Sequence, residues 1–448
     1  MADPRPLLDS YPLYIDGRWV DAESGSYDDI CPATEATIAK APDAGLADVD
    51  AAIAAARRAF DSGPWASAAP EERARCITQL GNALMQHADE FFALSQVEWG
   101  CIANERLIQT DGPAFMALRA GELAAQLTDE PINAFGSPGT TVLCHEPLGV
   151  VSILTPWNFP HSLNVMKVGN ALAAGNTVVL KPSPLTPLAG LALARIIDEH
   201  TDIPAGVVNV ITPSGIEASK MLTTDPRIDM ISFTGSSAVG REVMAAAGGT
   251  MKRILLQSRL LLPEPIHDEV VDRLVELARG VKVGDPTDPE VQMGPLISSA
   301  QRDRVEAHVA SALTDGATLA AGGRRPAGLE KGFYFEPTIL TDVPPGARIA
   351  QEEVFGPVLT VFRCRDDDDA VAIANNSQYG LSGAVWGTDV DRAVAVARRV
   401  RTGQIAVNGC IPGDAPFGGF KQSGLGREGG GLQGLHRYME PKAIGIPA

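Results

Sequence analysis

Short apolar runs and segments of helical character alternate along the central part of the chain. Runs of strand length occur at residues 150–156, 177–183, 207–212, 228–236 and 252–257. Strands and helices that alternate in this way predict a doubly wound parallel α/β domain. In such a domain, ligands bind at the carboxyl ends of the strands.

A second α/β region is predicted further along the chain. Helical segments at 267–284 and 301–316 lead into strand-like runs at 354–363, 381–387 and 404–409, separated by helical segments at 366–377 and 390–403.

The two ends of the chain follow other patterns. Near the N-terminus, "LYIDGRWV" alternates around Asp16-Gly17 as a hairpin does, and residues 46–60 and 71–98 have the apolar spacing of helices. Residues 139–149 and the C-terminal "YMEPKAIGIP" predict extended strands.

One stretch, "MKRILLQSRLLLPEP" at residues 251–265, breaks the alternation. An apolar run passes straight into another, with only Gln257 and Ser258 between them. Two parallel strands need a crossover of a dozen or more residues. The stretch is therefore either one long strand or two strands whose connection is absent.

Composition limits the function classes. With 448 residues, 45% of them hydrophobic, a soluble protein of two to four domains is expected at roughly 150 residues per domain. A net charge of −18 argues against a nucleic-acid partner. There is no N-terminal signal and no apolar run long enough to cross a membrane.

Cysteine and histidine usage points to a cytoplasmic protein without a metal site. The six cysteines are far apart and form no CxxC pair, which fits a reducing compartment better than a disulfide framework. The seven histidines are scattered, with no spacing typical of a metal site.

Two strand ends carry candidate polar groups. Asn158, in "TPWNFP", can donate an amide hydrogen to a developing oxyanion, although a loop Asn can simply close a turn. Lys181, in "VVLKPS", can reach a ribose hydroxyl or a phosphate, with a solvated strand-end Lys as the alternative.

Further candidates lie in two later motifs. "FTGSSAVG" contains Gly235 and Ser236 between a strand and a helix start, where backbone N–H groups can hold a phosphate. Glu353, in "EEVFGPV", can bind ribose hydroxyls or form a helix-end salt bridge. "GLGREG" matches GxGxxG but follows no strand of a βαβ unit, so a flexible loop is expected at 424–429.

Cys410 is the candidate thiol, in the strand-to-loop exit "VNGCIPGDAPFGG". A nucleophilic Cys needs a lowered pKa and a nearby base or donor. No base is apparent beside it, which favours a packed or idle thiol.

Taken together, these motifs resemble those of the NAD(P)-dependent aldehyde dehydrogenase superfamily over nearly the whole chain. The matching stretches, in order, include "YIDGRWVDA", "EPLGVVSILTPWNFP", "ALAAGNTVVLKPSPLTP", "DMISFTGSSAVGREVM", "QMGPLIS", "QEEVFGPVLTV" and "APFGGFKQSGLGRE".

The resemblance implies an aldehyde dehydrogenase-like α/β architecture in three parts. A doubly wound nucleotide-binding domain would comprise residues 1–130 and 150–257, and an α/β catalytic domain residues 258–423. Residues 131–149 and 424–448 would form a small β oligomerisation arm, because the family usually forms dimers or tetramers.

The resemblance also implies an aldehyde substrate, NAD or NADP as cofactor, and specific roles. Asn158 matches the oxyanion-hole residue. The cofactor would be held by Trp157, Lys181, Ser183, Gly235, Ser236, Glu353 and Phe355. In the family reaction a Cys thiolate attacks the aldehyde, hydride passes to the nicotinamide, and a Glu activates water.

Measured against this family, the stretch around Gln257 and Ser258 lacks a segment. The strand matching "MKRILL" normally leads into a Glu-Leu-Gly-Gly-Lys turn, a strand, a long helix and the Gly-Gln-x-Cys loop. Roughly 35–40 residues are absent, in a chain short for its class. The nucleophile Cys and the general-base Glu go with them, as do one strand and one helix of the catalytic domain.

Two smaller departures affect the cofactor site. Pro184 stands where the family often has a Glu that holds the adenosine ribose, so the choice between NAD and NADP stays open. Pro213 stands where a Gly is common.

Three functions are consistent with these features of the chain. The first is an aldehyde dehydrogenase that uses Cys410 or another substitute thiol. The second is a non-catalytic protein that binds NAD(P) or serves as an oligomer partner. The third is a deletion variant without selected activity. Loss of a covalent nucleophile commonly costs several orders of magnitude in rate, so impaired catalysis is expected.

Overall fold

The computed structural model describes residues 10–132, 139–236, 239, 240, 242, 259–413, 415–424 and 426–447. The predicted strand 252–257, most of the helix predicted to start after Ser236 and the seam between Gln257 and Ser258 lie outside the described residues.

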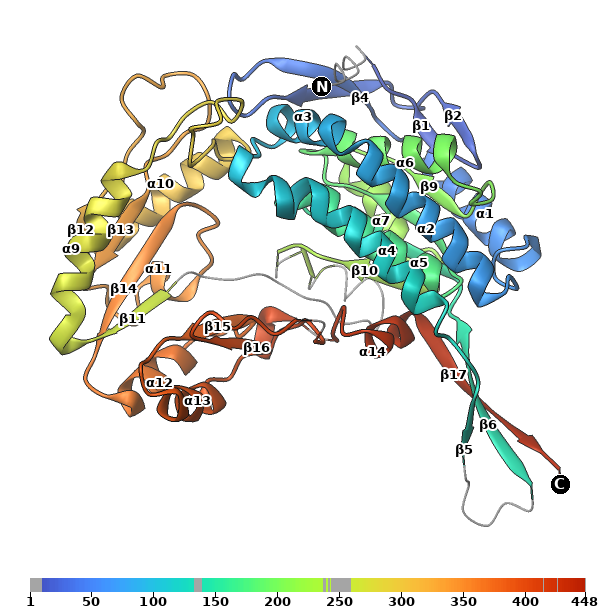
Figure 1. The fold of residues 1–448 in the computed structure, drawn as a ribbon. Helices are drawn as coiled ribbons and strands as arrows, with labels where there is room; N and C mark the ends of the chain where they lie inside the picture. Colours follow the sequence, from blue (N-terminus) through green and yellow to red (C-terminus); the bar gives the residue numbers. More distant parts are fainter. Residues whose placement is uncertain are drawn as a thin grey trace.

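The first sheet has the strand order β10-β7-β8-β9-β1-β2 (Figure 1). Its four parallel strands are β7 (Val150–Leu154), β8 (Thr177–Lys181), β9 (Val208–Val210) and β10 (Met230–Phe233). The hairpin of β1 (Leu13–Ile15) and β2 (Arg18–Val20) extends it in antiparallel fashion. The four predicted strands before residue 252 are therefore confirmed, each shorter than its apolar run.

Helices bury both faces of this sheet, as a parallel sheet requires. Val151 and Ile153 point into one core and Val150 and Leu154 into the other. The first core is closed by α2 (Pro70–Gln86), α3 (Ala88–Glu98), α4 (Gly112–Ala124), α5 (Pro160–Ala173) and α6 (Pro187–His200), and the second by α1 (Leu46–Ser62) and α7 (Ile216–Thr224).

The helix predicted over 71–98 is two helices. At His87 the backbone leaves helical geometry, with φ −101° and ψ 13°, so α2 ends there and α3 begins. The apolar spacing continues across the break, which is why the pattern alone does not reveal it.

The second region contains two sheets that no ladder joins within the described residues. One has the order β11 (Arg259–Pro263), β14 (Val358–Cys364), β13 (Thr338–Thr341) and β12 (Thr318–Ala321). The other is a parallel pair, β15 (Ser382–Val385) and β16 (Gln404–Val407). Their helices are α9 (Glu264–Gly280), α10 (Ser299–Thr314), α11 (Arg348–Gln351), α12 (Asp367–Asn375) and α13 (Val390–Arg399).

The pair β15–β16 is unusually open. Parallel strands are normally covered on both faces, yet no residue of β15 or β16 is fully buried. Trp386, directly after β15, is 72% exposed. This part of the second region therefore presents apolar surface to solvent.

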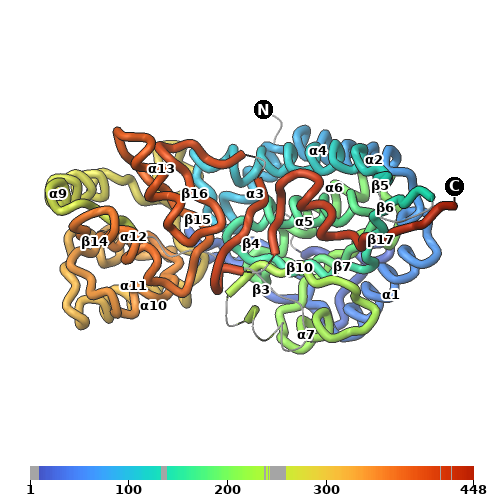
Figure 2. Tube along the Cα trace, turned by 90° about the horizontal axis from the view of Figure 1, so that it is seen from below, coloured from blue at the N-terminus to red at the C-terminus, as the bar shows by residue number. Residues whose placement is uncertain are grey.

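A third sheet projects from the body of the molecule (Figure 1). It joins β5 (Glu130–Ile132), β6 (Thr140–Pro147) and β17 (Met439–Ile446), all antiparallel. The C-terminal segment reaches it by crossing from the second region over the centre of the molecule (Figure 2), and α14 (Leu432–Leu435) lies just before β17 (Figure 1). The expected pairing of residues near 131–149 with the C-terminal strand is present.

The smaller elements include the hairpin β3 (Ser26–Ile30) and β4 (Thr37–Pro42), and a π-helical turn at Leu107–Asp111. Three single 3-10 turns lie at Ala103–Glu105, Lys421–Ser423 and His436–Tyr438. Within the described part of the chain, no helix has the length and apolar character that a membrane crossing would need.

Asn176 links three parts of the first region to the C-terminus. Its Oδ1 accepts from the Gly149 amide at 2.8 Å, and its Nδ2 donates to the carbonyls of Tyr438 at 2.8 Å and Ala171 at 3.3 Å. The side chain is fully buried. It therefore fixes the entry to β7 and the entry to β17 at once.

We expect Asn176→Ala to lower the free energy of unfolding by about 2–4 kcal/mol, because it leaves buried backbone groups without partners. Urea unfolding followed by circular dichroism measures this. Asn104→Ala, at an exposed position, serves as the control and should change stability by less than about 0.5 kcal/mol. Equal effects of the two substitutions would contradict the role assigned to Asn176.

Candidate functional site

A cleft of about 960 Å³ opens at the carboxyl ends of β7, β8 and β10. It is lined by Leu154 to Asn158 after β7, by Lys181, Ser183 and Pro184 after β8, and by Phe233 to Ser236 after β10. This is the edge at which a doubly wound sheet binds ligands. We call it the strand-end cleft.

The strand-end cleft brings together every cofactor residue that the sequence singled out. Trp157, Lys181, Ser183, Gly235, Ser236, Glu353 and Phe355 all line it, and so does Asn158. Their individual roles remain predictions. The first five come from the first region, whereas Glu353 and Phe355 come from the second.

The loop carrying Glu353 and Phe355 is held by α10. Gln301 Nε2 donates to the carbonyls of Val354 at 3.0 Å and Phe355 at 2.9 Å, and the Arg304 guanidinium donates to the Glu353 carbonyl at 2.8 Å. These contacts hold Phe355 at φ +57°, a conformation that costs an aromatic residue about 1–3 kcal/mol. The strained backbone aims the Phe355 ring into the cleft.

The Phe355 ring meets Trp157 across the cleft. Their ring centroids lie 4.8 Å apart with an interplanar angle of 68°, an edge-to-face contact. The two regions therefore touch through these side chains at the cleft itself.

Two ionisable side chains in the cleft have shifted pKa values. Burial raises the pKa of the Glu353 carboxyl to about 8, with a smaller opposing effect of Arg304. Burial lowers the pKa of the Lys181 ammonium to about 8, and its Nζ donates to the Pro182 carbonyl at 3.0 Å. Both groups gain from a bound polar partner, since each is partly desolvated without one.

Gly235 and Ser236 shape the turn after β10. A Cβ on Gly235 would lie 2.5 Å from the Phe233 ring, so a larger residue there would require that ring to shift. The Ser236 hydroxyl accepts from the Val239 amide at 3.3 Å. Small residues keep this turn open to a ligand group.

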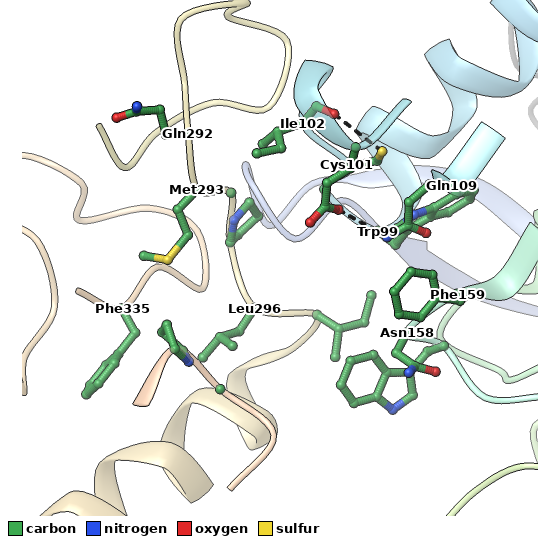
Figure 3. A pocket seen from close by; sticks show the side chains of 18 residues that line it. Trp99, Cys101, Ile102, Gln109, Asn158, Phe159, Gln292, Met293, Leu296 and Phe335 are labelled. Atoms are coloured by element: carbon green, nitrogen blue, oxygen red, sulfur yellow. Dashed lines mark hydrogen bonds between the residues drawn. The ribbon is translucent and has the colours of Figure 1, made fainter. Parts of the chain in front are cut away.

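A second cavity, of about 310 Å³, lies between the two regions (Figure 3). We call it the inter-region cavity. Trp99, Cys101, Ile102 and Gln109 line it from the first region, and Met293, Leu296 and Phe335 face them from the second. Trp157 and Asn158 line both spaces, so they separate the cavity from the strand-end cleft.

Asn158 is the polar group best placed in this wall. Its Oδ1 is buried and has no hydrogen-bond partner among the described residues. This unpartnered oxygen can accept a hydrogen bond from a ligand group, whereas the donor to an oxyanion that the sequence predicts would be the amide nitrogen, Nδ2.

The sequence did not point to most of the inter-region cavity. Its one local signal is "QMGPLIS", one of the stretches that resemble the family. Gly294 in that motif permits close approach, because a Cβ there would lie 2.6 Å from the Gly100 carbonyl oxygen. Residues 99–109 carry no motif, and only the packing of distant segments brings them to the site.

None of the six cysteines is placed as a nucleophile. Cys101 is the only one that lines either space, and burial raises the pKa of its thiol to about 11 while the thiol donates to the Ile102 carbonyl at 3.6 Å. A thiol of raised pKa is a poor nucleophile at neutral pH. Cys410 is exposed and lines neither space.

A buried ion pair was missed by sequence reasoning. Lys167 on α5 is fully buried, with its Nζ 2.7 Å from the Glu428 carboxylate and 3.0 Å from the Ser232 hydroxyl. Ser232 in turn lies 3.2 Å from the Tyr438 hydroxyl. The network ties β10 to the C-terminal segment.

Glu428 belongs to "GLGREG", for which a flexible loop was expected. The expectation is wrong for this residue, because its backbone also exchanges two 2.7 Å hydrogen bonds with Phe417. The rejection of GxGxxG as a dinucleotide fingerprint stands, since the motif follows no strand of the first sheet. Among the described residues, no group of three or more His, Cys, Asp or Glu side chains could hold a metal ion.

Comparison with known proteins identifies the fold. The model of the aldehyde dehydrogenase family matches residues 19–258 and 256–444. The chain belongs to the aldehyde dehydrogenase family.

Two curated relatives illustrate how complete the likeness is. The chain is 35% identical to the betaine aldehyde dehydrogenase of Bacillus subtilis (strain 168), with 97% of each chain covered. It is 34% identical to the peroxisomal aminoaldehyde dehydrogenase 1 of Pisum sativum, over 98% of this chain and 96% of that protein.

Solved structures of aldehyde dehydrogenases agree with the α/β architecture. The Mycobacterium tuberculosis enzyme, crystallised with NAD+, superposes with a TM-score of 0.94 at 38% identity and covers 98% of this chain and 99% of its own. The NAD-dependent enzyme of Sinorhizobium meliloti superposes with a TM-score of 0.95 at 34% identity, and the match covers 100% of this chain and 96% of that one. The aldehyde dehydrogenase fold is thereby established for this chain.

The environment of Glu353 generates a prediction about its titration. We expect the Glu353 carboxyl of the free protein to titrate with a midpoint near pH 8, because burial disfavours its charged form. Carbon-13 NMR of glutamate-labelled protein between pH 5 and 9 measures it. The signal should vanish in Glu353→Gln and remain in Glu352→Gln, the adjacent control. A midpoint near 4.5 for Glu353 would contradict the buried environment.

Proposed function

We propose that this aldehyde dehydrogenase family member binds NAD or NADP in the strand-end cleft but oxidises aldehydes poorly or not at all. One observation carries the proposal. The cleft gathers the predicted binding residues on both sides, while no cysteine in a nucleophile-like environment lines it.

The residues present fit a dinucleotide. Lys181 and Ser183 would hold the adenosine ribose, Trp157, Gly235 and Ser236 the pyrophosphate, and Glu353 and Phe355 the nicotinamide ribose and ring. The relatives from Mycobacterium tuberculosis and Staphylococcus aureus were crystallised with NAD+. When bound, the nicotinamide would supply a hydride acceptor.

The impairment is attributed to a segment missing between Gln257 and Ser258. The family model matches in two parts that meet at residues 256–258. The alignment with the Bacillus subtilis relative extends over 477 positions, whereas the chain has 448 residues, so at least 29 (477 − 448) of those positions are gaps in this chain. By resemblance to the family, the proposed missing segment is the one that carries the nucleophile Cys and the general-base Glu.

The second region offers a structural argument for the same gap. Among the strands that the structure describes, β11 is the last of its sheet, and the parallel pair β15–β16 stands apart with much of its surface exposed. A strand between the two sheets would join them into one, and a helix would cover the exposed face. The proposed loss of one strand and one helix accounts for both features.

Asn158 alone cannot support the family reaction. Its predicted role is to donate to an oxyanion, but no covalent adduct forms without a nucleophile. The alternative nucleophile, Cys410, is exposed and lies outside both spaces. A deletion variant without selected activity is the remaining alternative.

We further propose a homodimer or homotetramer in the cytoplasm. The sheet β5-β6-β17 projects from the body, and its outer strands leave edges that invite pairing with a second copy (Figure 1). All six cysteines are free thiols, which suits a reducing compartment. From the family resemblance we also propose three parts: a nucleotide-binding domain of residues 1–130 and 150–257, a catalytic domain of residues 258–423, and an oligomerisation arm of residues 131–149 and 424–448.

Cofactor binding without turnover tests the proposal. Dinucleotide at 100 times its dissociation constant should stabilise the protein by about 2.7 kcal/mol, seen as a raised melting temperature. Incubation with betaine aldehyde or a simple aldehyde should give no reduced cofactor above background. Absence of any shift at millimolar dinucleotide would contradict binding. Turnover that disappears in Cys410→Ser would establish the substitute thiol instead.

Restoring the segment should restore catalysis. We expect a chimera that carries the aligned segment of the Bacillus subtilis relative between Gln257 and Ser258 to gain aldehyde oxidation by at least about 10³-fold, since it regains a covalent nucleophile. The control is the same chimera with each cysteine of the inserted segment changed to Ala, which should be inactive. A soluble chimera that binds dinucleotide yet stays inactive would show that the scaffold itself is defective.

A further inference from the structure

The projecting sheet β5-β6-β17, which we call the arm sheet, carries two stacked histidines at its root. His145 lies on β6, and His436 lies in the 3-10 turn just before β17. The ring centroids are 3.8 Å apart and the two rings are parallel to within 5°. The stack therefore joins the strand that enters the body of the molecule to the turn from which the C-terminal strand departs (Figure 1).

The stack lies close to the buried anchor of Asn176. The Tyr438 carbonyl, which accepts from Asn176, is two residues beyond His436. The Leu148 amide, three residues beyond His145, donates to the same carbonyl at 3.4 Å. Any change in the stack therefore acts on the point at which the arm sheet joins the body.

Both imidazole rings of the stack are open to protonation. Each ring belongs to a half-buried residue, and no described residue forms a hydrogen bond or ion pair with either ring. Two neutral rings can stack at this distance without repulsion. Two imidazolium ions 3.8 Å apart would repel each other, because like charges at contact distance interact strongly wherever water is partly excluded.

The charged groups around the stack can balance one positive charge but not two. Glu130, on β5, is the carboxylate that acts on His436. Glu146 follows His145 and so points to the opposite face of β6, where it is paired with Lys442 at 2.8 Å. Arg437, next to His436 in the turn, is exposed and brings a further positive charge.

A second pair of histidines shows the contrasting, balanced arrangement. The rings of His87 and His200 lie 4.8 Å apart and are tilted by 39°. Each has a carboxylate beside it, with Glu90 3.2 Å from His87 Nδ1 and Glu199 3.6 Å from His200 Nε2. Protonation of both rings there would be offset by two negative charges, so this pair provides a matched control.

Proton binding and docking of the arm sheet oppose each other. Burial and then the neighbouring His145 lower the pKa of His436 below its ordinary value, with an opposing effect of Glu130. The docked arm consequently binds fewer protons than a released arm would. Docking is therefore complete above the ordinary histidine pKa of about 6.5 and weakens as the pH falls below it.

We infer that the stack of His145 on His436 is a pH-sensitive latch, which holds the arm sheet to the body at neutral pH and loosens its root in mild acid. The latch is separate from the strand-end cleft and goes beyond the proposed function. If copies of the chain pair through the arm sheet, mild acid would also weaken that pairing.

Hydrogen–deuterium exchange of the full chain measures the latch directly. We expect exchange of the β6 and β17 amides, corrected for its intrinsic pH dependence, to rise about tenfold between pH 7.5 and 5.0. The released arm can take up two protons, whereas the stack accommodates only one. The amides of β8 and β9 report general destabilisation by acid. An arm that shows no rise beyond theirs would overturn the latch.

Substitutions that keep a ring but remove its charge assign the effect to the two histidines. In His145→Phe and in His436→Phe the corrected exchange of the arm should be the same at both pH values, since a phenyl ring stacks without taking up a proton. His200→Phe, in the balanced pair, should keep the tenfold rise. Thermal unfolding at pH 7.5 verifies that each variant folds. A rise that persists in both stack variants would overturn the assignment.

Discussion

The parallel sheet β10-β7-β8-β9 sets the geometry on which the rest of the molecule depends. Because its strands run in one direction, each needs a covering crossover, and both faces become buried core. The carboxyl edge is then left as the place where loops can diverge. The residues after β7, β8 and β10 meet there, so segments almost 80 residues apart line one cleft. The set of residues that line the cleft therefore follows from topology rather than from nearness in sequence.

The second region completes the cleft through a small number of strong constraints. Two side chains of α10 donate three hydrogen bonds to the loop at 353–355, and these bonds maintain the unfavourable φ of Phe355. A strained backbone conformation of this kind persists only where several surrounding contacts hold it in place. The Lys167–Glu428 pair fixes the C-terminal segment against β10 in a similar way, since an unpaired buried ammonium would be costly. The hydrogen bonds from α10 and the Lys167–Glu428 ion pair both fix elements of the cleft, and neither contributes a reacting group.

Sequence reasoning recovered what local pattern encodes and missed what depends on distant contacts. The strands β7 to β10 were visible as apolar runs bounded by turn residues, and Asn158, Lys181 and Ser236 were visible because each follows such a run. The ion pair of Lys167 with Glu428 joins residues 261 positions apart and leaves no local trace. The break at His87 was hidden for the opposite reason, because the apolar spacing of the two helices is continuous through it.

Under the proposed function, cofactor binding and reaction depend on different parts of the chain. The residues proposed to hold a dinucleotide are spread over three strand ends and a loop of the second region, so no single internal segment contains them all. A nucleophile and its base are different, because covalent catalysis needs both at one place and tolerates the loss of neither. The proposed gap between Gln257 and Ser258 would therefore remove the reacting groups together and leave the walls of the cleft in place.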